Sequence, residues 1–474
     1  IWLIKTDING NVLWDKVIGI SPDQVITNKT VSDNNGNLYC FGTIVQGIDP
    51  LWPLAIKLNS CGELQWCRQL YFEEYEYGQF YDAMILENGD LLAVANMPDE
   101  DQYDMIFLFC ISPDGEYKWK RSYASKENYP DFEMRLGSRI QFFDDIYIIS
   151  GYVYSPHPNY PTVTSIRPMF IGIDTLFNEK WVLEFGLEDN MKGKALETIQ
   201  INDSLYMGVG RYRYIDSTGE TQDAWAMIYN DKGEQTGYKI ISADKLGSEI
   251  TESVFYEIVR VNDSMYLASS GYFYGEEDEN AKGEIIFDTA GNVYNYSLRE
   301  NTAGGNSSVI KTFDNKYTIA CSYQYPDLSY DVYLYKVNDS LEQDTVYPGT
   351  YTYDSLCPGT IQSGVIDLTG CGVITNMEDI PWLEGSKKQE STIDLKVYPI
   401  PSKDYVIMEY NLETETQGTI EIKDITGKTI YAKATTGKQD QLTLVTNTWS
   451  AGVYIATIKI DGKAIESVKF TLVK

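Results

Sequence analysis

The sequence predicts an all-β fold in which a β-propeller precedes a small β-sandwich. Three observations lead to this prediction. A pair of β-hairpins recurs throughout residues 1–371, a different set of short strands fills residues 395–474, and no segment between the strands has convincing amphipathic helical periodicity. The alternation of strands and helices that would indicate an α/β fold is therefore missing.

The first recurring hairpin has an apolar strand, a turn of Asp or Asn with Gly, and a second strand that often carries Trp. Asn-Gly and Asp-Gly pairs tolerate the left-handed backbone that a tight hairpin needs. Copies with Trp occupy residues 1–14, 55–66, 109–119 and 171–181, and weaker copies without it occupy 226–238, 284–296 and 332–346.

The second recurring hairpin lies between the copies of the first, on turns rich in Asn, Asp and Gly. Its copies occupy residues 31–39, 85–92, 142–147, 201–206, 261–266 and 311–317. Two hairpins make four antiparallel strands in a period of about fifty to sixty residues, the size of one propeller blade. A lone blade cannot bury both of its apolar faces, so the blades must stack in a ring.

Seven copies of the first hairpin and six of the second predict seven blades, with six or eight as alternatives. The missing second hairpin would lie upstream of Ile1, or a segment within residues 357–376 would take its place. Ile1 already lies in a strand-like run, so we expect that the start of the chain is processed or that this sequence begins within the protein. Two β-sandwiches are the rival architecture, which would not require this repetition.

The charge of the chain limits its partners. The net charge is −31, and residues 395–474 are nearly neutral, so almost all of it lies in the repeats. Such a surface repels nucleic acid phosphates and anionic lipid, and we expect neither as a partner. No apolar run is long enough for a membrane helix, so we expect a chain that does not span a membrane.

Seven cysteines in 474 residues are too few for a disulfide-dense scaffold. Cys357 and Cys371 bracket a short loop, and we predict a disulfide between them, contributing roughly 3 kcal/mol in the chain-entropy model. Cys61 and Cys67 are poor partners for each other, because a strand would hold their Cα atoms about 13 Å apart. The other cysteines lie in apolar strand runs and are predicted core residues: Cys40, Cys110 and Cys321.

A polar, unpatterned stretch at residues 372–394 predicts a linker to the last domain. About seven short strands in residues 395–474 fit an immunoglobulin-like sandwich. Four motifs occur there in order. They consist of Val397, Tyr398, Pro399 and Pro401; Gly427 and Lys428; Gly452 and Tyr454; and a last strand with Lys469.

With these motifs the domain resembles the type A C-terminal sorting domain of the Bacteroidota type IX secretion system. Ile400 departs from the family, which usually has Asn there, and would weaken the opening turn. Residues 1–371 more diffusely resemble the propeller-like cargo regions of exported Bacteroidota proteins.

The resemblance implies a route and a set of partners. The chain would fold in the periplasm and pass through the type IX translocon. An outer-membrane β-barrel shuttle and a sortase-like attachment enzyme would then receive it. The family usually loses the sorting domain, and we expect the cut within residues 377–394. The destination would be the cell surface or the extracellular space.

Exported proteins of this group are also O-glycosylated at Asp-Ser or Asp-Thr followed by a small or aliphatic residue. The chain has eight such triplets, whereas composition alone would supply about two. Turn-forming preference is the other explanation, because Asp-Ser and Asp-Thr suit hairpin turns. The candidate hydroxyls are those of Thr175, Ser204, Ser217, Ser264, Thr289, Ser340, Thr345 and Ser355.

Residues that carry chemistry are sparse. The single histidine, His157, leaves no basis for a His-rich metal site or a Ser-His-Asp triad, and we predict no catalytic residues and no cofactor. Calcium is a minor alternative, since Asp7–Asn11 and Asp33–Asn37 have calcium-loop spacing, although both lack the later bidentate acid and fit hairpin turns.

One loop interleaves acids with aromatic residues that could contact sugar rings: Phe72, Tyr75, Tyr77 and Tyr81. An exposed connection between hairpins is the simpler interpretation. We predict a non-catalytic binding or adhesion module, with surface glycan as a candidate ligand. The alternative is an extracellular enzyme acting on glycan or peptide at the propeller mouth. Convergent carboxylates in the central channel would favour the enzyme, and an aromatic patch elsewhere would favour binding.

Overall fold

The structure of the chain is a computed structural model that divides into two compact units, Ile1–Gly385 and Ser386–Lys474. The residues that it describes are 1–19, 24–45, 51–71, 77–98, 103–157, 160–187, 191–215, 220–247, 250–274, 279–299, 302, 307–325, 329–343, 346–374, 394–398, 402–403, 405–412, 418–424, 428–435, 439–460 and 463–473. Each unit is described by itself.

The described part of the first unit contains seven β-sheets, which we label A to G. In chain order they are A, β1 (Trp2–Thr6), β2 (Val12–Gly19) and β26 (Gly364–Asp367); B, β3 (Gln24–Ser32), β4 (Leu38–Val45), β5 (Leu51–Leu58), β6 (Leu64–Leu70) and β27 (Gly372–Ile374); C, β7 (Gln79–Ile85), β8 (Leu91–Pro98), β9 (Asp104–Ile111) and β10 (Tyr117–Tyr123); D, β11 (Met134–Phe143), β12 (Ile146–His157), β13 (Tyr160–Asp174) and β14 (Glu179–Glu184); E, β15 (Lys192–Asn202), β16 (Leu205–Ile215), β17 (Glu220–Asn230) and β18 (Gln235–Ile241); F, β19 (Ile250–Arg260), β20 (Met265–Tyr274), β21 (Glu279–Asp288) and β22 (Val293–Arg299); and G, β23 (Ser308–Lys311), β24 (Tyr317–Gln324) and β25 (Tyr330–Val337).

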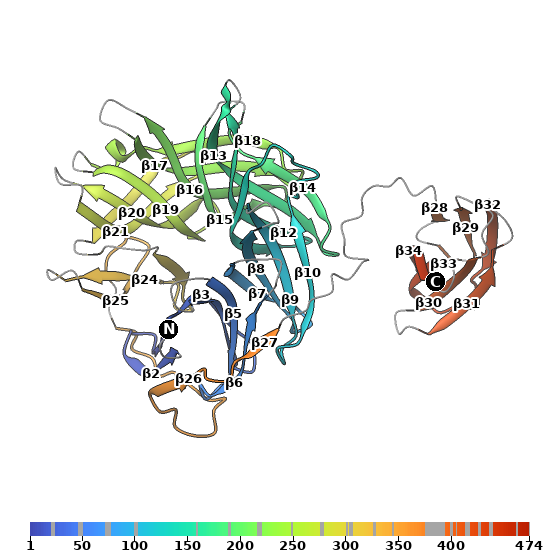
Figure 1. Cartoon of the computed structure of the whole chain (residues 1–474), viewed down its shortest axis with the longest axis horizontal. Helices are drawn as coiled ribbons and strands as arrows, with labels where there is room; N and C mark the ends of the chain where they lie inside the picture. The colour runs from blue at the N-terminus through green and yellow to red at the C-terminus, as the bar shows by residue number, and fades with distance from the viewer. Residues whose placement is uncertain are drawn as a thin grey trace. The chain divides into compact units, whose positions relative to one another are not determined.

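These sheets follow one another around a ring, as Figure 1 shows. The first strands of sheets B to G also contact one another in succession, from β3 through β7, β11, β15 and β19 to β23. These strands therefore line the axis, and the later strands of each sheet lie farther out. The predicted β-propeller is confirmed. The described part contains one helical turn, η1 (Ala243–Lys245), and no helix long and apolar enough to cross a membrane.

Sheet A differs from the others, because in the described chain it has no inner hairpin before β1. Of the two predicted alternatives, a segment within residues 357–376 does join sheet A, but as the single strand β26 beside β2 and not as an inner hairpin. β26 and β27 instead pair in parallel with the outer strands β2 and β6. The propeller thus includes residues 372–374, which were predicted to begin the linker; residues 375–393 lie outside the described part. The number of blades stays a prediction.

The hairpins form because a side chain within each turn accepts hydrogen bonds from the backbone N–H groups of the same turn. In the β1–β2 turn, the Asp7 carboxylate accepts the backbone N–H groups of Asn9 and Asn11, each at 2.8 Å. Gly10 supplies the left-handed conformation, with φ +86°. Asp33 holds the β3–β4 turn in the same way. The recurring Asx-Gly pattern is therefore turn chemistry.

Two of the recurring Trp residues, Trp66 and Trp181, join their blade to the next. The Trp66 indole on β6 donates to the carbonyl of Pro113 in the β9–β10 turn at 3.0 Å, and the ring covers Gly115. Trp181 on β14 does the same to the turn at Gly233, donating to the Asp231 carbonyl at 2.9 Å. A glycine lies under each indole because a Cβ atom would be only 2.8 Å or less from the ring.

The predicted disulfide between Cys357 and Cys371 is wrong. Cys357 bonds Cys61 and Cys371 bonds Cys67, with Cα separations of 5.0 and 5.1 Å. The reason is the path of the chain after the last repeat, which pairs first with β2 and then with β6, and so meets Cys61 in the β5–β6 turn and Cys67 on β6 in turn. The three predicted core cysteines are confirmed as buried and free: Cys40, Cys110 and Cys321.

The second unit is a two-sheet sandwich. One sheet is β28 (Asp394–Tyr398), β29 (Tyr405–Asn411) and β32 (Gln439–Val445); the other is β31 (Thr429–Ala434), β30 (Gly418–Asp424), β33 (Gly452–Ile460) and β34 (Lys463–Leu472). Alternate apolar residues of both sheets face inward, including Met408, Ile422 and Phe470. This arrangement agrees with the predicted immunoglobulin-like sandwich.

Candidate functional site

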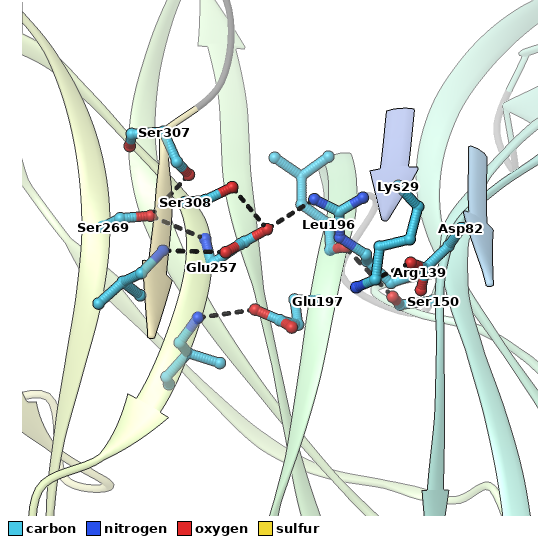
Figure 2. Close-up of polar contacts among 12 residues, drawn as sticks. Lys29, Asp82, Arg139, Ser150, Leu196, Glu197, Glu257, Ser269, Ser307 and Ser308 are labelled. Atoms are coloured by element: carbon cyan, nitrogen blue, oxygen red, sulfur yellow. Dashed lines mark hydrogen bonds and ion pairs between the residues drawn. The ribbon is translucent and has the colours of Figure 1, made fainter. Parts of the chain in front are cut away.

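The axis of the propeller carries a charged side chain at the same place in five consecutive inner strands. Each follows a β-bulge, where the register of the strand against its neighbour shifts by one residue, and a bulge redirects the side chain beside it. These residues are Lys29, Asp82, Arg139, Glu197 and Glu257, and Figure 2 shows them converging from different sheets.

The three carboxylates join neighbouring sheets. Each accepts a hydrogen bond from a backbone N–H group of the next sheet, at the residue that follows the equivalent inner position. The pairs are Asp82 with Ile140 at 2.8 Å, Glu197 with Ile258 at 2.7 Å, and Glu257 with Val309 at 2.9 Å. A bulge leaves a backbone N–H outside the strand ladder, and a carboxylate is its strongest acceptor.

Cations hold the remaining carboxylate oxygens. Arg139 donates to Glu257 at 2.7 Å, across the axis from sheet D to sheet F, and the Ser308 hydroxyl donates to the same oxygen at 3.1 Å. Lys29 forms an ion pair with Asp82 at 3.0 Å. The carboxylates of Asp82 and Glu257 are thus engaged on both oxygens.

Glu197 has the most perturbed carboxyl group at the axis. Burial and repulsion by Glu257 raise its pKa to about 8, although Arg139 opposes them. The side-chain amide of Gln141 donates to its second oxygen at 3.0 Å. At neutral pH the group is therefore largely protonated, which limits the repulsion between two neighbouring acids.

The sequence offered a signal for this set, but it was missed. Each member is a polar residue within an otherwise alternating inner strand, and successive members are about fifty to sixty residues apart, which is the period of the repeat. The bulges that bring them to one axis leave no mark in a hydrophobicity pattern.

No group of three or more His, Cys, Asp or Glu side chains is arranged to hold a metal ion in the part of the chain that the structure describes. In the two loops with calcium-like spacing, the Asp7 and Asp33 carboxylates accept hydrogen bonds from their own turns. Calcium binding there stays a minor alternative.

The predicted aromatic loop is only partly described. Phe72 and Tyr75 lie outside the described residues, and Tyr77 is half-buried. Tyr81 belongs to the inner strand β7, at its bulge, where burial raises the pKa of the phenol. Tyr81 is therefore part of the propeller wall rather than of an exposed loop.

The residues of the sorting motifs serve the sandwich in different ways. Val397 and Tyr454 are core residues, and the Tyr454 hydroxyl donates to the Ser450 carbonyl at 2.8 Å. The Tyr398 hydroxyl donates to Glu409. Gly452, Lys428 and Lys469 are exposed. Pro399, Pro401 and Gly427 lie outside the described residues.

The candidate O-glycosylation sites concentrate at hairpin tips. Five are exposed: Thr175, Ser204, Ser264, Ser340 and Ser355. Thr289 is half-buried, and Ser217 and Thr345 lie outside the described residues. Exposure makes modification feasible, and modification itself stays a prediction.

Comparisons with known proteins identify the second unit. Residues 396–473 match the family described as "Secretion system C-terminal sorting domain". No curated protein matches the chain.

Several solved structures resemble the chain distantly. A polysaccharide lyase of family PL25, an ulvan lyase, shares 11% identity with a TM-score of 0.41, covering 66% of this chain and 78% of its own. The WD40 domain of SCAP from fission yeast shares 10% identity with a TM-score of 0.31, covering 94% and 95%. An endo-arabinase from Bacteroides thetaiotaomicron shares 12% identity with a TM-score of 0.29, covering 57% and 94%.

The sorting domain determines the destination of the chain, which is the cell surface or the extracellular space. The chain therefore belongs to the Bacteroidota proteins that the type IX secretion system exports, and it carries a β-propeller as its cargo domain.

Proposed function

We propose that the propeller is a non-catalytic module that binds glycans at the cell surface or outside the cell. The observation that carries this proposal is an exposed aromatic stack beside a cavity. Phe313 and Tyr351 are 60% and 58% exposed and stack with ring centroids 5.5 Å apart, and Tyr347 meets Phe313 edge to face. Exposed flat aromatic faces suit the apolar faces of sugar rings.

The cavity lies between sheets G and A and has a volume of about 330 Å³. Both apolar and polar groups line it, among them Ile310, Asn9 and Lys336. Asn9 also exchanges hydrogen bonds with the backbone of Tyr347, which fixes the aromatic stack against the β1–β2 turn. A cavity of this size, with a few polar groups, is typical of a small-ligand site.

The carboxylates at the axis also support a non-catalytic role. Asp82 and Glu257 are engaged by backbone N–H groups and cations, so they serve the architecture of the ring. A hydrolytic pair needs one carboxylate placed to attack or to activate water.

A glycan array probed with the full chain tests the proposal. We expect binding to neutral glycans that falls at least tenfold in the double variant F313A/Y351A. Tyr325→Ala, which removes another exposed tyrosine, is the matched control and should bind normally. A chain that retains no glycan would refute the proposal.

An extracellular hydrolase is the second candidate, and Glu197 is the observation that favours it. A carboxyl group with its pKa near 8, next to Glu257, has the property of a general acid. Release of reducing ends from oligosaccharides by the purified chain, abolished in E197Q, would establish this candidate. No release from any substrate on the array would exclude it for those glycans.

A further inference from the structure

A small pocket lies at one end of the sorting domain. Its volume is about 170 Å³, below the roughly 300–1,000 Å³ of small-molecule pockets, so it suits a single side chain rather than a whole ligand. Segments far apart in the sequence line it. Lys403 comes from the chain before β29, Trp449 and Ala451 from the chain before β33, and Val473 from the residue after β34.

Three of the four sorting motifs meet at this pocket. Lys403 lies two residues after the first motif, Ala451 directly precedes the third, and Val473 follows the strand that carries the fourth. Backbone hydrogen bonds join the first segment to the last, because Ser402 accepts from the Val473 N–H at 2.7 Å and donates to the Thr471 carbonyl at 2.9 Å. The features by which the domain is recognised therefore surround one pocket.

The pocket contains hydrogen-bond donors that the fold does not use. Thr446 is only 1% exposed, and its hydroxyl has no hydrogen-bond partner among the described residues. A buried hydroxyl without a partner is destabilising, so the pocket favours a ligand that accepts a hydrogen bond from it. Lys403 is exposed at the rim and forms no ion pair with any residue that the structure describes. No carboxylate of a described residue lines the pocket.

Apolar surface accompanies these donors. The Trp449 ring lines the pocket and packs against the core residue Tyr454, with ring centroids 5.4 Å apart, which fixes the indole in place. Tyr405 and Val445, which adjoin this end of β29 and β32, lie directly opposite each other and are 47% and 64% exposed. Exposed apolar side chains next to a pocket are typical of a surface that binds another protein.

We propose that this pocket receives an acidic side chain, Asp or Glu, of an outer-membrane protein of the type IX secretion machinery. The carboxylate accepts hydrogen bonds from the Thr446 hydroxyl and the Lys403 ammonium, and its methylene stem packs on Trp449. A charged group held within an apolar rim is the kind of anchor that dominates a protein interface. The proposal concerns export and is independent of glycan binding by the propeller.

Surface delivery of the full chain, measured on intact cells of a bacterium with a type IX secretion system, tests the proposal. We expect delivery to fall at least tenfold in K403E, which reverses the charge at the rim, and to be normal in K403R. A451F, which fills the pocket from an exposed position, should reduce delivery to the same degree. The matched control is K433E, which makes the same charge change at an exposed position of β31 and should be delivered normally.

The variant T446V separates recognition from folding. It removes an unpaired buried hydroxyl, so the melting temperature should not decrease, whereas delivery should decrease. A photo-crosslinker at position 451 should capture an outer-membrane component of the secretion system, identified by mass spectrometry, and one at position 433 should not. Normal delivery of K403E and A451F would overturn the proposal, as would equal loss in K433E. Crosslinks from position 451 to lipid alone would also overturn it.

Discussion

At the scale of single residues, the polar groups at the bulges of the inner strands are the most informative. After the bulges of β11 and β19, the backbone N–H groups of Ile140 and Ile258 donate to carboxylates of the preceding sheet. Carboxylates that could be mistaken for an active site therefore mostly bind neighbouring blades to one another. Glu197 is the exception in its protonation, because burial and Glu257 keep its pKa high.

That protonation has a measurable consequence for stability. The native state holds the Glu197 proton up to about pH 8, whereas an unfolded chain releases it near the ordinary value of 4.5. Between these values the native state binds more protons, so its stability decreases as the pH rises. We expect E197Q, which cannot titrate but keeps an acceptor for Ile258, to lose less stability than the wild type between pH 5 and pH 8.

Melting temperatures at several pH values check this expectation. E116Q, at an exposed position, is the control and should follow the wild type. Parallel curves for wild type and E197Q would contradict the prediction.

At the scale of elements, the hairpin is the unit that the sequence specifies best. Its turn is closed by a side chain and a glycine within five residues, as at Asp7–Asn11, so local pattern suffices to locate it. The local pattern could not predict what Trp66 and Trp181 contact, because the partner of each lies about fifty residues away in the next blade.

The contact between Trp66 and Gly115 predicts a pair of variants with different costs. Gly115 and Gly89 both have left-handed backbone, with φ +79° and +86°. A Cβ atom at Gly115 would lie 2.8 Å from the indole, whereas one at Gly89 would meet an ordinary contact at 3.6 Å. Both alanine variants carry the backbone strain of about 1–2 kcal/mol. We expect G115A to lose about 1–3 kcal/mol more through overpacking.

Urea unfolding of the two variants measures this difference. Equal losses of unfolding free energy in G115A and G89A would show that the Trp66 indole moves aside without destabilising the fold.

At the scale of the whole molecule, what the sequence could not indicate is contact between distant segments. No turn motif in the sequence predicts that β26 and β27 pair in parallel with earlier strands. The two disulfides join residues that are 296 and 304 positions apart. The prediction of Cys357–Cys371 followed from sequence proximity, which is a poor guide once the chain returns to an earlier sheet. The sorting domain was recognised because its motifs are contiguous and ordered.

The disulfide pairing is open to direct measurement. Peptide mapping without reductant should yield two cross-linked pairs, Cys61 with Cys357 and Cys67 with Cys371. Cys40, Cys110 and Cys321 should react with an alkylating reagent only after unfolding, since all three are buried. A Cys357–Cys371 peptide would contradict the structure.

The role of the sorting domain in export can be tested by deleting it. Deleting residues 395–474 should leave a folded propeller in the periplasm, because the two units have separate cores and only the second is the sorting domain. Fractionation, with protease resistance of the retained protein as the folding control, checks this. Delivery of the shortened chain to the surface would contradict it.

The two disulfides also decide how the molecule bears tension. A pull between the two chain ends enters at Ile1, crosses the covalent bridges of sheet B, and leaves through the linker, so residues 68–356 form a loop outside the force path. Most of the propeller is thereby shielded from traction on its C-terminal tail. In a single-molecule stretching experiment, the intact chain should release only the length of its two end segments, and a reductant should release the rest.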